Sequence, residues 1–465
     1  MNESRRNDGN CCGKRKVPVT TSVEGHFKRA RTRALASCLC FALFWAGHAF
    51  ATDWPQWRGP NRAAAWTESG IVEKLPTTGL KILWRAPVAM GYSSPVIAAG
   101  NVYLSDAELN KPKVRERVHC LEADSGKLRW SYCYETPAPD WFFTEDQARG
   151  PGATPIVWKG KVYALDLFGS LVCLDAKHGQ VVWKKNLKEE FQMKETSVDA
   201  SPLIEGDLLI LMLGGKQGAG IVALDRKNGH EVWRALNESV TWSSPIVIDA
   251  GGVRQLIVWT QQSVSSLNPA DGKLYWREAT STGGSPGTAG VSTPVFQDGY
   301  LLVSGWMFQL EKDRPAGKAL WPEGQGVSRR ILSDTSTGML LGDYVYSAKT
   351  GGEFVCLKAA TGQEIWKTSA VTDLKNGASI HVIGTRNSAF LFNDRGELIQ
   401  ARLAPGGYEE IGRTKLIEPT SRFGGRNVSW AAPAFAHQNV YARNDQELIC
   451  ASLAANLYPA YRHGK

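Results

Sequence analysis

The chain lacks several of the short motifs that mark common catalytic sites. His-Glu-x-x-His and the glycine-rich phosphate loop are absent from its 465 residues, which argues against a zinc protease and a P-loop NTPase. No Cys-x-x-Cys-His occurs, so a covalently attached c-type haem is excluded. The eight histidines are scattered without a second ligand nearby, and we expect no metal site.

The one long apolar run near the N-terminus is too short to span a membrane, which takes about 20 residues. This run, Ala34–Ala46, follows a cluster of Lys and Arg and precedes the small-x-small sequence Ala49-Phe50-Ala51. We interpret residues 1–51 as an export signal with a long basic lead, cleaved near Ala51. The mature chain is then expected to be periplasmic or otherwise exported, with no transmembrane segment.

Beyond this segment the chain has little excess charge. The formal net charge is +9, but residues 1–51 hold nine Lys or Arg and three Asp or Glu, which leaves +3 on residues 52–465. A balance that mild gives no reason to expect nucleic acid as a partner. We expect a monomer.

What the chain does have is a repeated phrase, Leu-x4-Gly-x3-Trp. Its copies are Leu121–Gly126–Trp130, Leu174–Gly179–Trp183, Leu224–Gly229–Trp233, Leu267–Gly272–Trp276 and Leu357–Gly362–Trp366. Successive copies are 53, 50, 43 and 90 residues apart, and the last spacing is two periods. A period in the forties with several short strands per unit is typical of a β-propeller. We expect these tryptophans, with Trp84, to pack between blades.

A second phrase, two small residues and then Pro before a short apolar strand, predicts the number of blades. Complete copies end at Pro95, Pro155, Pro202, Pro245 and Pro294, and degenerate copies contain Thr337, Ser379 and Pro433. Eight starts predict an all-β, eight-bladed propeller over residues 80–455, between an N-terminal strap (52–79) and a tail (456–465). The last unit lacks a terminal strand, so the strand around Trp84 is expected to complete it.

Five cysteines follow residue 51, and they do not resemble a disulfide framework. Four occupy the same repeat position, at Cys120, Cys173, Cys356 and Cys450, where Ala223 and Ser266 stand in other repeats. A position that accepts Cys, Ala or Ser is small and buried, and equivalent positions in different blades are too far apart to bridge. The sequence therefore predicts free thiols in the core.

The repeat resembles the pyrroloquinoline-quinone (PQQ) type of propeller repeat, for which Asp175–Trp183 is a good example. That family includes quinoprotein alcohol dehydrogenases and the outer-membrane assembly factor BamB. The resemblance covers roughly Trp54 to Ala455. It implies the propeller fold for this chain and leaves its function open, because cofactor-free members carry the same tryptophan motif.

The loops that enter the innermost strands are expected to meet at one mouth of the central channel, where propellers bind ligands. The residue three before each Pro, or its equivalent, should approach this mouth. These eight mouth positions are Tyr92, Gly152, Asp199, Trp242, Val291, Asp334, Asn376 and Trp430. Nearby loops add Arg149, Arg329, Arg330, Lys375, His381, Arg426 and Asn427.

Two interpretations of these residues stay open. In the first, Asp199 and Asp334 face Arg149, Arg330 and Arg426 around a polar pocket in which Trp242 stacks on a ligand. In the second, the charges pair with one another and tie adjacent blades together. Two aromatic stretches carry the same ambiguity, one in the loop 135–150 and one in the segment 54–61, since each can pack on the propeller or bind a partner.

The expected function is a non-catalytic binding or scaffolding module of the cell envelope, with an envelope protein or a small polar ligand at the mouth and no cofactor. The alternative is a PQQ-dependent alcohol dehydrogenase like the polyvinyl-alcohol enzymes, with Ca²⁺ and quinone in the channel and Asp199 or Asp334 as the base. Family enzymes often carry two adjacent cysteines above the quinone, and none follow residue 51.

Overall fold

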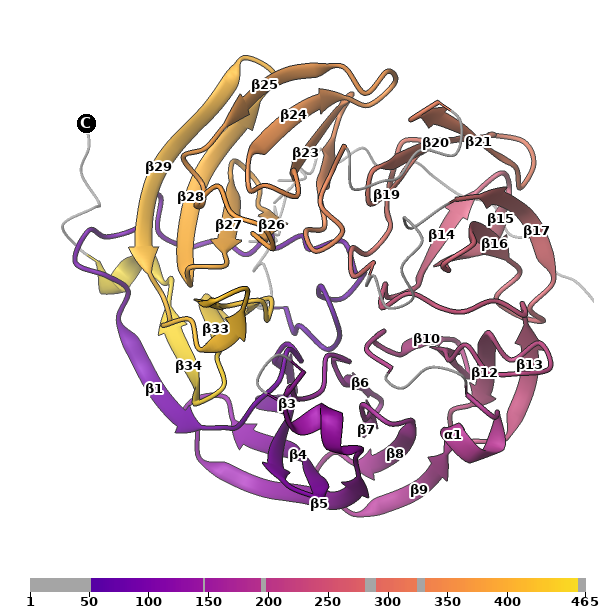
Figure 1. The fold of residues 1–465 in the computed structure, drawn as a ribbon. Coiled ribbons are helices and arrows are strands. Elements are labelled where there is room, and N and C mark those ends of the chain that lie inside the picture. The colour runs from indigo at the N-terminus through magenta and orange to yellow at the C-terminus, as the bar shows by residue number, and fades with distance from the viewer. Residues whose placement is uncertain (1–51, 145–146, 194–197, 281–289, 324–330, 459–465) are drawn as a thin grey trace, which may run out of the picture. The chain divides into compact units, whose positions relative to one another are not determined.

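Eight four-stranded antiparallel sheets follow one another around a ring in the computed structural model (Figure 1). The structure describes residues 52–144, 147–193, 198–280, 290–323 and 331–458. The expected export signal, the site candidate Arg330 and most of the expected tail lie outside the described residues. The prediction of an eight-bladed β-propeller is confirmed.

Each sheet forms one blade, and in seven of the eight blades the strands run in chain order from the channel outward (Figure 1). Blades one and two contain β2 (Val96–Ala98), β3 (Asn101–Asn110), β4 (Lys113–Glu122), β5 (Leu128–Pro137), β6 (Ile156–Trp158), β7 (Lys161–Leu165), β8 (Ser170–Asp175) and β9 (Val181–Asn186). Blades three and four contain β10 (Leu203–Glu205), β11 (Leu208–Met212), β12 (Ile221–Asp225), β13 (Glu231–Ala235), β14 (Ile246–Ala250), β15 (Val253–Trp259), β16 (Ser263–Leu267) and β17 (Leu274–Ala279).

The remaining strands complete the ring. Blades five to seven contain β18 (Val295–Gln297), β19 (Tyr300–Val303), β20 (Trp306–Leu310), β21 (Gly317–Trp321), β22 (Met339–Leu341), β23 (Tyr344–Ala348), β24 (Phe354–Lys358), β25 (Glu364–Thr368), β26 (Ile380–Gly384), β27 (Ala389–Asn393), β28 (Glu397–Ala404) and β29 (Gly407–Lys415). Blade eight contains β32 (Ala434–Ala436), β33 (Asn439–Arg443), β34 (Glu447–Ser452) and β1 (Ile82–Pro87), after a separate hairpin of β30 (Ser421–Phe423) and β31 (Arg426–Val428).

Helical turns occur in the connections. They are η1 (Asp140–Phe143), α1 (Leu187–Glu190) and η3 (Ala455–Leu457). In the part of the chain that the structure describes, no helix is long and apolar enough to cross a membrane.

The N-terminal strand closes the ring, as predicted. β1 pairs antiparallel with β34 and places Trp84 opposite Cys450. The last blade therefore takes its outermost strand from the start of the propeller and its inner three from the end. This pairing ties both ends of the ring together and covers the edge that β34 would otherwise expose.

At several blades a hydroxyl side chain just ahead of the innermost strand links neighbouring blades. The bonds run from the backbone N–H of one residue to the hydroxyl oxygen of the next: Ser94 to Thr154 (3.0 Å), Thr154 to Ser201 (3.0 Å), Ser201 to Ser244 (2.9 Å) and Thr293 to Thr337 (3.0 Å). An innermost strand has no neighbouring strand on its channel side to accept its backbone N–H groups. The hydroxyl oxygen accepts one of these N–H groups, and a proline at the next position has no N–H that needs an acceptor.

The repeat tryptophans connect each blade to the following one. Their indole N–H groups donate to backbone carbonyls there: Trp84 to Ala123 (2.8 Å), Trp130 to Ala176 (3.1 Å), Trp183 to Arg226 (3.1 Å), Trp233 to Pro269 (3.1 Å), Trp321 to Ala359 (2.6 Å) and Trp366 to Ala404 (2.8 Å). Trp276 differs, because its indole N–H donates to Gln255 of its own blade at 2.9 Å. The blade after Trp276 has no complete copy of the repeat phrase.

The repeat cysteines are free thiols in the core, which confirms the prediction from the sequence. Cys120 and Cys173 lie directly opposite Trp130 and Trp183 on neighbouring strands. A small side chain at this position leaves room for the indole. Cys133 is free and exposed.

Residues 54–66, here called the channel plug, pass through the middle of the ring and appear in indigo in Figure 1. Trp54 exchanges two backbone hydrogen bonds of 2.9 Å with Ile97 on the innermost strand of blade one. The carbonyl of Pro55 accepts the N–H of Val157 in blade two, also at 2.9 Å. The plug therefore uses inner-strand backbone groups that no sheet neighbour reaches.

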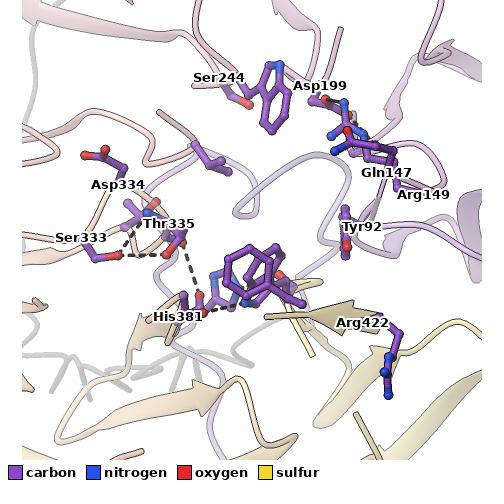
Figure 2. Close-up of a pocket in the computed structure, with 18 of the residues that line it drawn as sticks. Tyr92, Gln147, Arg149, Asp199, Ser244, Ser333, Asp334, Thr335, His381 and Arg422 are labelled. Carbon is purple, nitrogen blue, oxygen red and sulfur yellow. Dashed lines mark hydrogen bonds and ion pairs between the residues drawn. The ribbon is translucent and has the colours of Figure 1, made fainter. Parts of the chain in front are cut away.

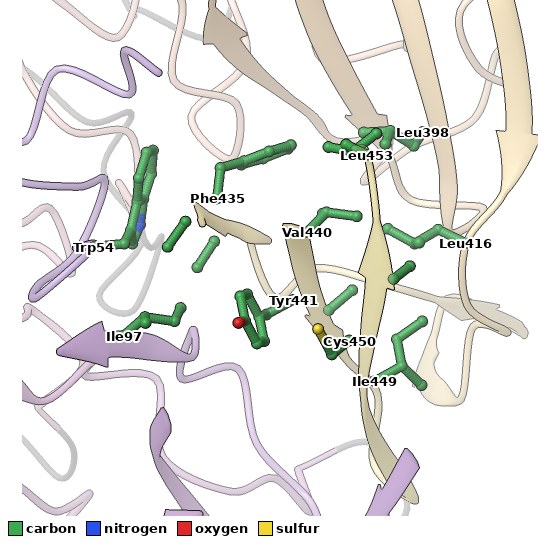
Figure 3. Close-up of a cluster of buried hydrophobic side chains, with 14 of the residues drawn as sticks. Trp54, Ile97, Leu398, Leu416, Phe435, Val440, Tyr441, Ile449, Cys450 and Leu453 are labelled. Carbon is green, nitrogen blue, oxygen red and sulfur yellow. The ribbon is translucent and has the colours of Figure 1, made fainter. Parts of the chain in front are cut away.

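Two tryptophans anchor the channel plug in the hydrophobic core. The rings of Trp54 and Trp66 lie 6.0 and 5.3 Å from the ring of Phe435, and both tryptophans are buried. Figure 3 shows Trp54, Ile97 and Phe435 around this part of the core. For Trp54 the structure thus selects packing from the two interpretations that the sequence left open.

Candidate functional site

One mouth of the channel opens into a cavity of about 650 Å³. All eight mouth positions line it: Tyr92, Gly152, Asp199, Trp242, Val291, Asp334, Asn376 and Trp430. They converge because every innermost strand starts at the same end of the ring. The channel plug contributes Trp57, which lines the cavity and whose indole N–H donates to Thr293 Oγ1 at 2.8 Å.

Arg149 connects two of the mouth positions. Its Nη2 lies 2.9 Å from Asp199 Oδ2, and its guanidinium carbon lies 4.3 Å from the centre of the Trp242 ring. Figure 2 shows Arg149 and Asp199 side by side at the cavity wall. The charge of Asp199 is therefore balanced within the protein, and the same guanidinium covers one face of Trp242.

A glycine makes room for this carboxylate. The backbone N–H of Gly152 donates to Asp199 Oδ1 at 3.0 Å. A β-carbon on Gly152 would lie 2.5 Å from the same oxygen. Asp199 is thus held by a backbone donor of blade two and by an arginine from the preceding loop, so that its carboxylate also links two blades.

A cluster of aromatic rings also lines the cavity. The ring of Trp430 lies 5.7 Å from that of Tyr92 and 4.6 Å from that of Phe423, and its indole N–H donates to the carbonyl of Gly377 at 3.0 Å. Burial, reinforced by the negative charge of Asp445, raises the pKa of Tyr92 to about 12. The Tyr92 hydroxyl therefore keeps its proton and can donate to a ligand.

His381, one of the residues that the sequence placed near the mouth, lines the cavity and is neutral. Burial lowers its pKa to about 4 against the opposing bond to Trp430, and the positive charge of Arg58 lowers it further. Its Nε2 lies 2.9 Å from the carbonyl oxygen of Trp430. A neutral ring that donates through Nε2 carries an unprotonated Nδ1, which can accept a hydrogen bond.

Asp334 is almost completely buried at the edge of the cavity. Its Oδ1 accepts the hydroxyl of Ser304 at 2.7 Å. Its backbone carbonyl accepts the N–H groups of Val291 and Ser292 of blade five, at 2.9 and 2.7 Å. The backbone of Asp334 is therefore part of the joint between blades five and six, while its side chain lines the cavity.

Arg426 is not among the residues that line the cavity. The sequence placed it beside Asp199 and Asp334, but its Nη1 binds Asp394 Oδ2 and its Nη2 lies 3.5 Å from the carbonyl of Asn376. Asp394 is fully buried, and a buried carboxylate needs a cationic partner. The requirement of Asp394 thus explains why Arg426 turns away from the cavity.

The aromatic loop 135–150 supplies both a packed ring and an exposed one. Phe142 is buried and lies 5.4 Å from the ring of Phe168 in blade two. Trp141 lines the cavity and is 47% exposed. Phe142 therefore packs on the propeller, as one of the two interpretations expected. Trp141 lies at the cavity mouth, where its exposed ring is available for contact with a partner.

Several lining residues were not among the residues predicted at the mouth, although two of them belong to the aromatic stretches 54–61 and 135–150. They include Trp57, Gln147, Ser333, Thr335, Thr350, Arg422 and Phe423. Arg422 and Phe423 lie on the β30–β31 hairpin, which is not part of any four-stranded blade and so falls outside the repeat. The dipeptide Gly424-Gly425 could have predicted this hairpin from the sequence, because Gly-Gly is typical of a tight turn between two short strands.

The described residues do not fit PQQ with Ca²⁺. Ca²⁺ takes about six to eight oxygen ligands, most often with several carboxylates, and within the described ranges no three His, Cys, Asp or Glu are grouped so that they could hold a metal ion. Asp199 already pairs with Arg149, and that arginine covers one face of Trp242, the ring expected to stack on a quinone. We therefore derive no catalytic step through this cofactor.

The blades, the repeat and the closing strand define a propeller of the PQQ-like repeat type. The chain belongs to the family whose model is described as "Outer membrane protein assembly factor BamB". That model matches residues 114–307 and 311–401, from β4 in blade one to β28 in blade seven. The matched part includes the mouth positions from Gly152 to Asn376.

Similar curated proteins carry two kinds of name. "Outer membrane protein assembly factor BamB" of Shewanella oneidensis is 24% identical over 266 residues, which cover 53% of this chain and 64% of the relative. "Alcohol dehydrogenase (quinone), dehydrogenase subunit" of Gluconobacter oxydans is 35% identical over 150 residues, which cover 30% of this chain and 18% of that subunit. The chain thus spans less than two thirds of the length of these relatives.

Solved structures show the same fold in both groups. The quinohemoprotein alcohol dehydrogenase of Comamonas testosteroni superposes with a TM-score of 0.62 at 14% identity, over 86% of this chain and 80% of that one. BamB of Moraxella catarrhalis superposes with a TM-score of 0.53 at 17% identity, over 80% and 97%. At these identities the similarity supports the fold alone.

Proposed function

We propose that this chain is an exported binding module of the cell envelope that holds a partner protein or a small polar ligand at the cavity without transforming it. The observation that carries the proposal is the position of Arg149. One guanidinium balances Asp199 and covers Trp242, so the carboxylate and the aromatic surface that a quinone enzyme would use are engaged with each other. Membership of the BamB family supports a role in assembly or binding.

The cavity walls suit recognition. Trp141, Tyr92 and Trp430 offer aromatic surface at the mouth, and aromatic rings supply large contact area with few rotatable bonds. The channel plug adds Trp57 to the same lining, so the cavity presents an aromatic residue of the plug as well as those of the blades. We propose further that the protein is a monomer outside the cytoplasm, with its signal cleaved near Ala51.

The alternative is a PQQ-dependent alcohol dehydrogenase with Ca²⁺ in the channel and Asp199 or Asp334 as the base. The 35% identity to the Gluconobacter oxydans subunit favours this alternative. It would require Arg149 to leave both Asp199 and Trp242 when a quinone binds. Breaking the ion pair of a nearly buried carboxylate is costly, which weighs against it.

Site-specific photocrosslinking in the native cells tests the proposal. A benzophenone amino acid in place of Trp141 lies at the cavity mouth, and the same amino acid in place of Val232 on the exposed outer strand β13 is the control. We expect a discrete adduct, protein or small molecule, from position 141 that is absent from position 232. Identical adducts from both positions, or none from position 141, would contradict binding at the mouth.

A further inference from the structure

Blade one carries a hydrogen-bonded chain of aspartate, histidine and serine across β3, β4 and β5, its three outer strands (Figure 1). Ser131 Oγ on β5 lies 3.0 Å from His119 Nδ1 on β4, and His119 Nε2 lies 3.1 Å from Asp106 Oδ1 on β3. Asp106 is fully buried, His119 is 8% exposed and Ser131 is exposed. The chain therefore runs from the interior of the blade to its surface, and its members are not among the residues that line the cavity.

Other blades place different side chains at the positions of the serine and the histidine. Ser131 directly follows a repeat tryptophan, and in five other blades the residue after this tryptophan is a cation: Arg85, Lys184, Arg234, Arg277 and Lys367. His119 lies directly opposite Ser131. The residues opposite those cations are, in the same order, Ile449, Val172, Val222, Ser265 and Val355. Blade one thus departs from the repeat at both positions together, although its tryptophan packs on the next blade as the others do.

The buried carboxylate determines where the histidine ring carries its proton. Burial alone would raise the pKa of Asp106, but hydrogen bonds from His119 and Arg117 outweigh burial and hold this pKa well below its usual range. Arg117 donates to both carboxylate oxygens, through Nε and Nη2, at 2.7 Å. An ionised carboxylate only accepts hydrogen bonds, so His119 donates to it through Nε2, and the neutral ring has an unprotonated Nδ1. Nδ1 therefore accepts the hydroxyl proton of Ser131.

A serine that donates to a histidine held by a buried aspartate has the connections that activate a hydroxyl as a nucleophile. A donor for a developing oxyanion stands beside it, since Cys133 Sγ lies 3.6 Å from Ser131 Oγ. The proton of Ser131 is used for His119, so the thiol is the donor in this contact. A thiol donates weakly, and we expect slow turnover, which makes covalent labelling the more sensitive readout.

We propose that Ser131 is the nucleophile of an acyl-transfer site that takes carboxylic esters, with His119 as the general base and Asp106 as a positioning residue. Ser131 Oγ bonds to the ester carbonyl carbon while its proton moves to His119 Nδ1. The C–O bond to the alcohol then breaks, and the same proton passes to the departing alkoxide. Water attacks the acyl-serine, gives a proton to His119 Nδ1, and releases the acid as that proton returns to Ser131. This site is separate from the cavity, so it does not depend on the proposed binding function.

A fluorophosphonate probe tests the proposal with the purified full chain, because it labels activated serines and leaves ordinary hydroxyls unmodified. Ser131 Oγ should bond to phosphorus while His119 takes the proton and fluoride leaves. Peptide mass spectrometry should then find a single adduct, on Ser131. Ser125 is the internal control in the same blade, because its exposed hydroxyl donates to a carboxylate, Glu122 Oε2, at 2.8 Å. No adduct on Ser131, equal labelling of Ser125, or an adduct on Cys133 instead would overturn the proposal.

Variants assign the roles of the serine and the base. Ser131→Ala should abolish the adduct, whereas Ser125→Ala should leave the rate of labelling within about twofold of the wild type. His119→Gln removes the base and should slow labelling at least tenfold. A thermal melt accompanies each variant. A folded His119→Gln protein that is labelled at the wild-type rate would overturn the proposal.

The dependence of labelling on pH is a readout that a purely structural role would not move. The wild-type rate should fall at acid pH, because a protonated imidazole cannot accept the serine proton. Asp106→Asn can present an oxygen to Nε2 only weakly matched to a cationic ring, or an N–H that reverses the tautomer, so labelling should slow at least tenfold and its pH profile should change. A wild-type rate that is constant between about pH 5 and 8 would overturn the proposal, even if a variant fails to fold. So would an Asp106→Asn protein with the wild-type rate and profile.

Discussion

The indole of Trp130 lies against the α-carbon of Gly179, so closely that a β-carbon there would meet the ring at 2.6 Å. Trp130 ends blade one, and Gly179 stands in the last turn of blade two. The same contact joins Trp84 to Gly126, where the N-terminal strand closes the ring. Each copy of the repeat therefore contributes a tryptophan to the next blade and a glycine that receives the tryptophan of the blade before.

A pair of glycines tests this contact. Gly179 and Gly160 both have a left-handed backbone, with φ of 70° and 74°, but only Gly179 faces the indole, and no atom lies within 4 Å of a β-carbon on Gly160. Gly160→Ala should cost about 1–2 kcal/mol from backbone strain alone. Gly179→Ala should cost about 1–3 kcal/mol more, because the ring must move. Urea denaturation of both variants measures the difference, and equal losses would contradict the packing role.

Removing a repeat tryptophan should destabilise the ring strongly. Trp183 donates to the carbonyl of Arg226 at 3.1 Å and packs against Gly229. We expect Trp183→Ala to lower the free energy of unfolding by about 3–5 kcal/mol. The adjacent exposed Val182 is the control, and Val182→Ala should change it by no more than about 0.5 kcal/mol. A Trp183→Ala protein as stable as the control would refute the account of blade packing.

Asp334→Asn should leave the fold intact. An amide oxygen can accept the Ser304 hydroxyl that Asp334 Oδ1 accepts now, and the backbone bonds to blade five do not involve the side chain. We expect the free energy of unfolding to change by less than about 1 kcal/mol. A loss above about 2 kcal/mol in chemical denaturation would show that the charge of Asp334 ties blades together.

His381 should make stability depend on pH. Its folded pKa of about 4 lies below the ordinary value of 6.5, so between these values the unfolded chain binds the proton and the folded chain does not. The contribution of His381 to stability is therefore fully present above pH 6.5 and falls as the pH drops towards 4. Where the unfolded chain binds nearly one proton more than the folded chain, the free energy of unfolding changes by about 1.4 kcal/mol per pH unit. In His381→Gln, which can still donate to Trp430, the fall in unfolding free energy from pH 7 to 4.5 should be smaller. An identical fall in both proteins would show that His381 is not the titrating group.

The repeat allowed the ring, its closure and the mouth positions to be predicted, because they follow from a periodic pattern. Counting three residues back from each strand-initiating proline leads to one cavity, since all inner strands start at the same end. The degenerate copies of the phrase also predicted mouth positions correctly, since Asp334 and Asn376 line the cavity.

Segments outside the repeat could not be placed by the same reasoning. The sequence predicted a strap before the blades, but its course through the channel depends on backbone bonds to Ile97 and Val157, which no local pattern shows. Arg426 was assigned to the pocket because it is near in sequence, whereas the buried charge of Asp394 determines its position. Side-chain partners of this kind depend on tertiary burial and not on spacing along the chain.

The most direct test of the central claim is a titration of the purified full chain with PQQ, with and without Ca²⁺, read by calorimetry and by tryptophan fluorescence. The account predicts no Ca²⁺-dependent binding, because Arg149 engages Asp199 and Trp242 and the described part of the chain groups no three His, Cys, Asp or Glu that could hold the ion. It also predicts no reduction of an artificial electron acceptor when alcohols are added. Saturable, Ca²⁺-dependent binding at one site per chain, with alcohol-dependent turnover, would contradict the account and establish the dehydrogenase.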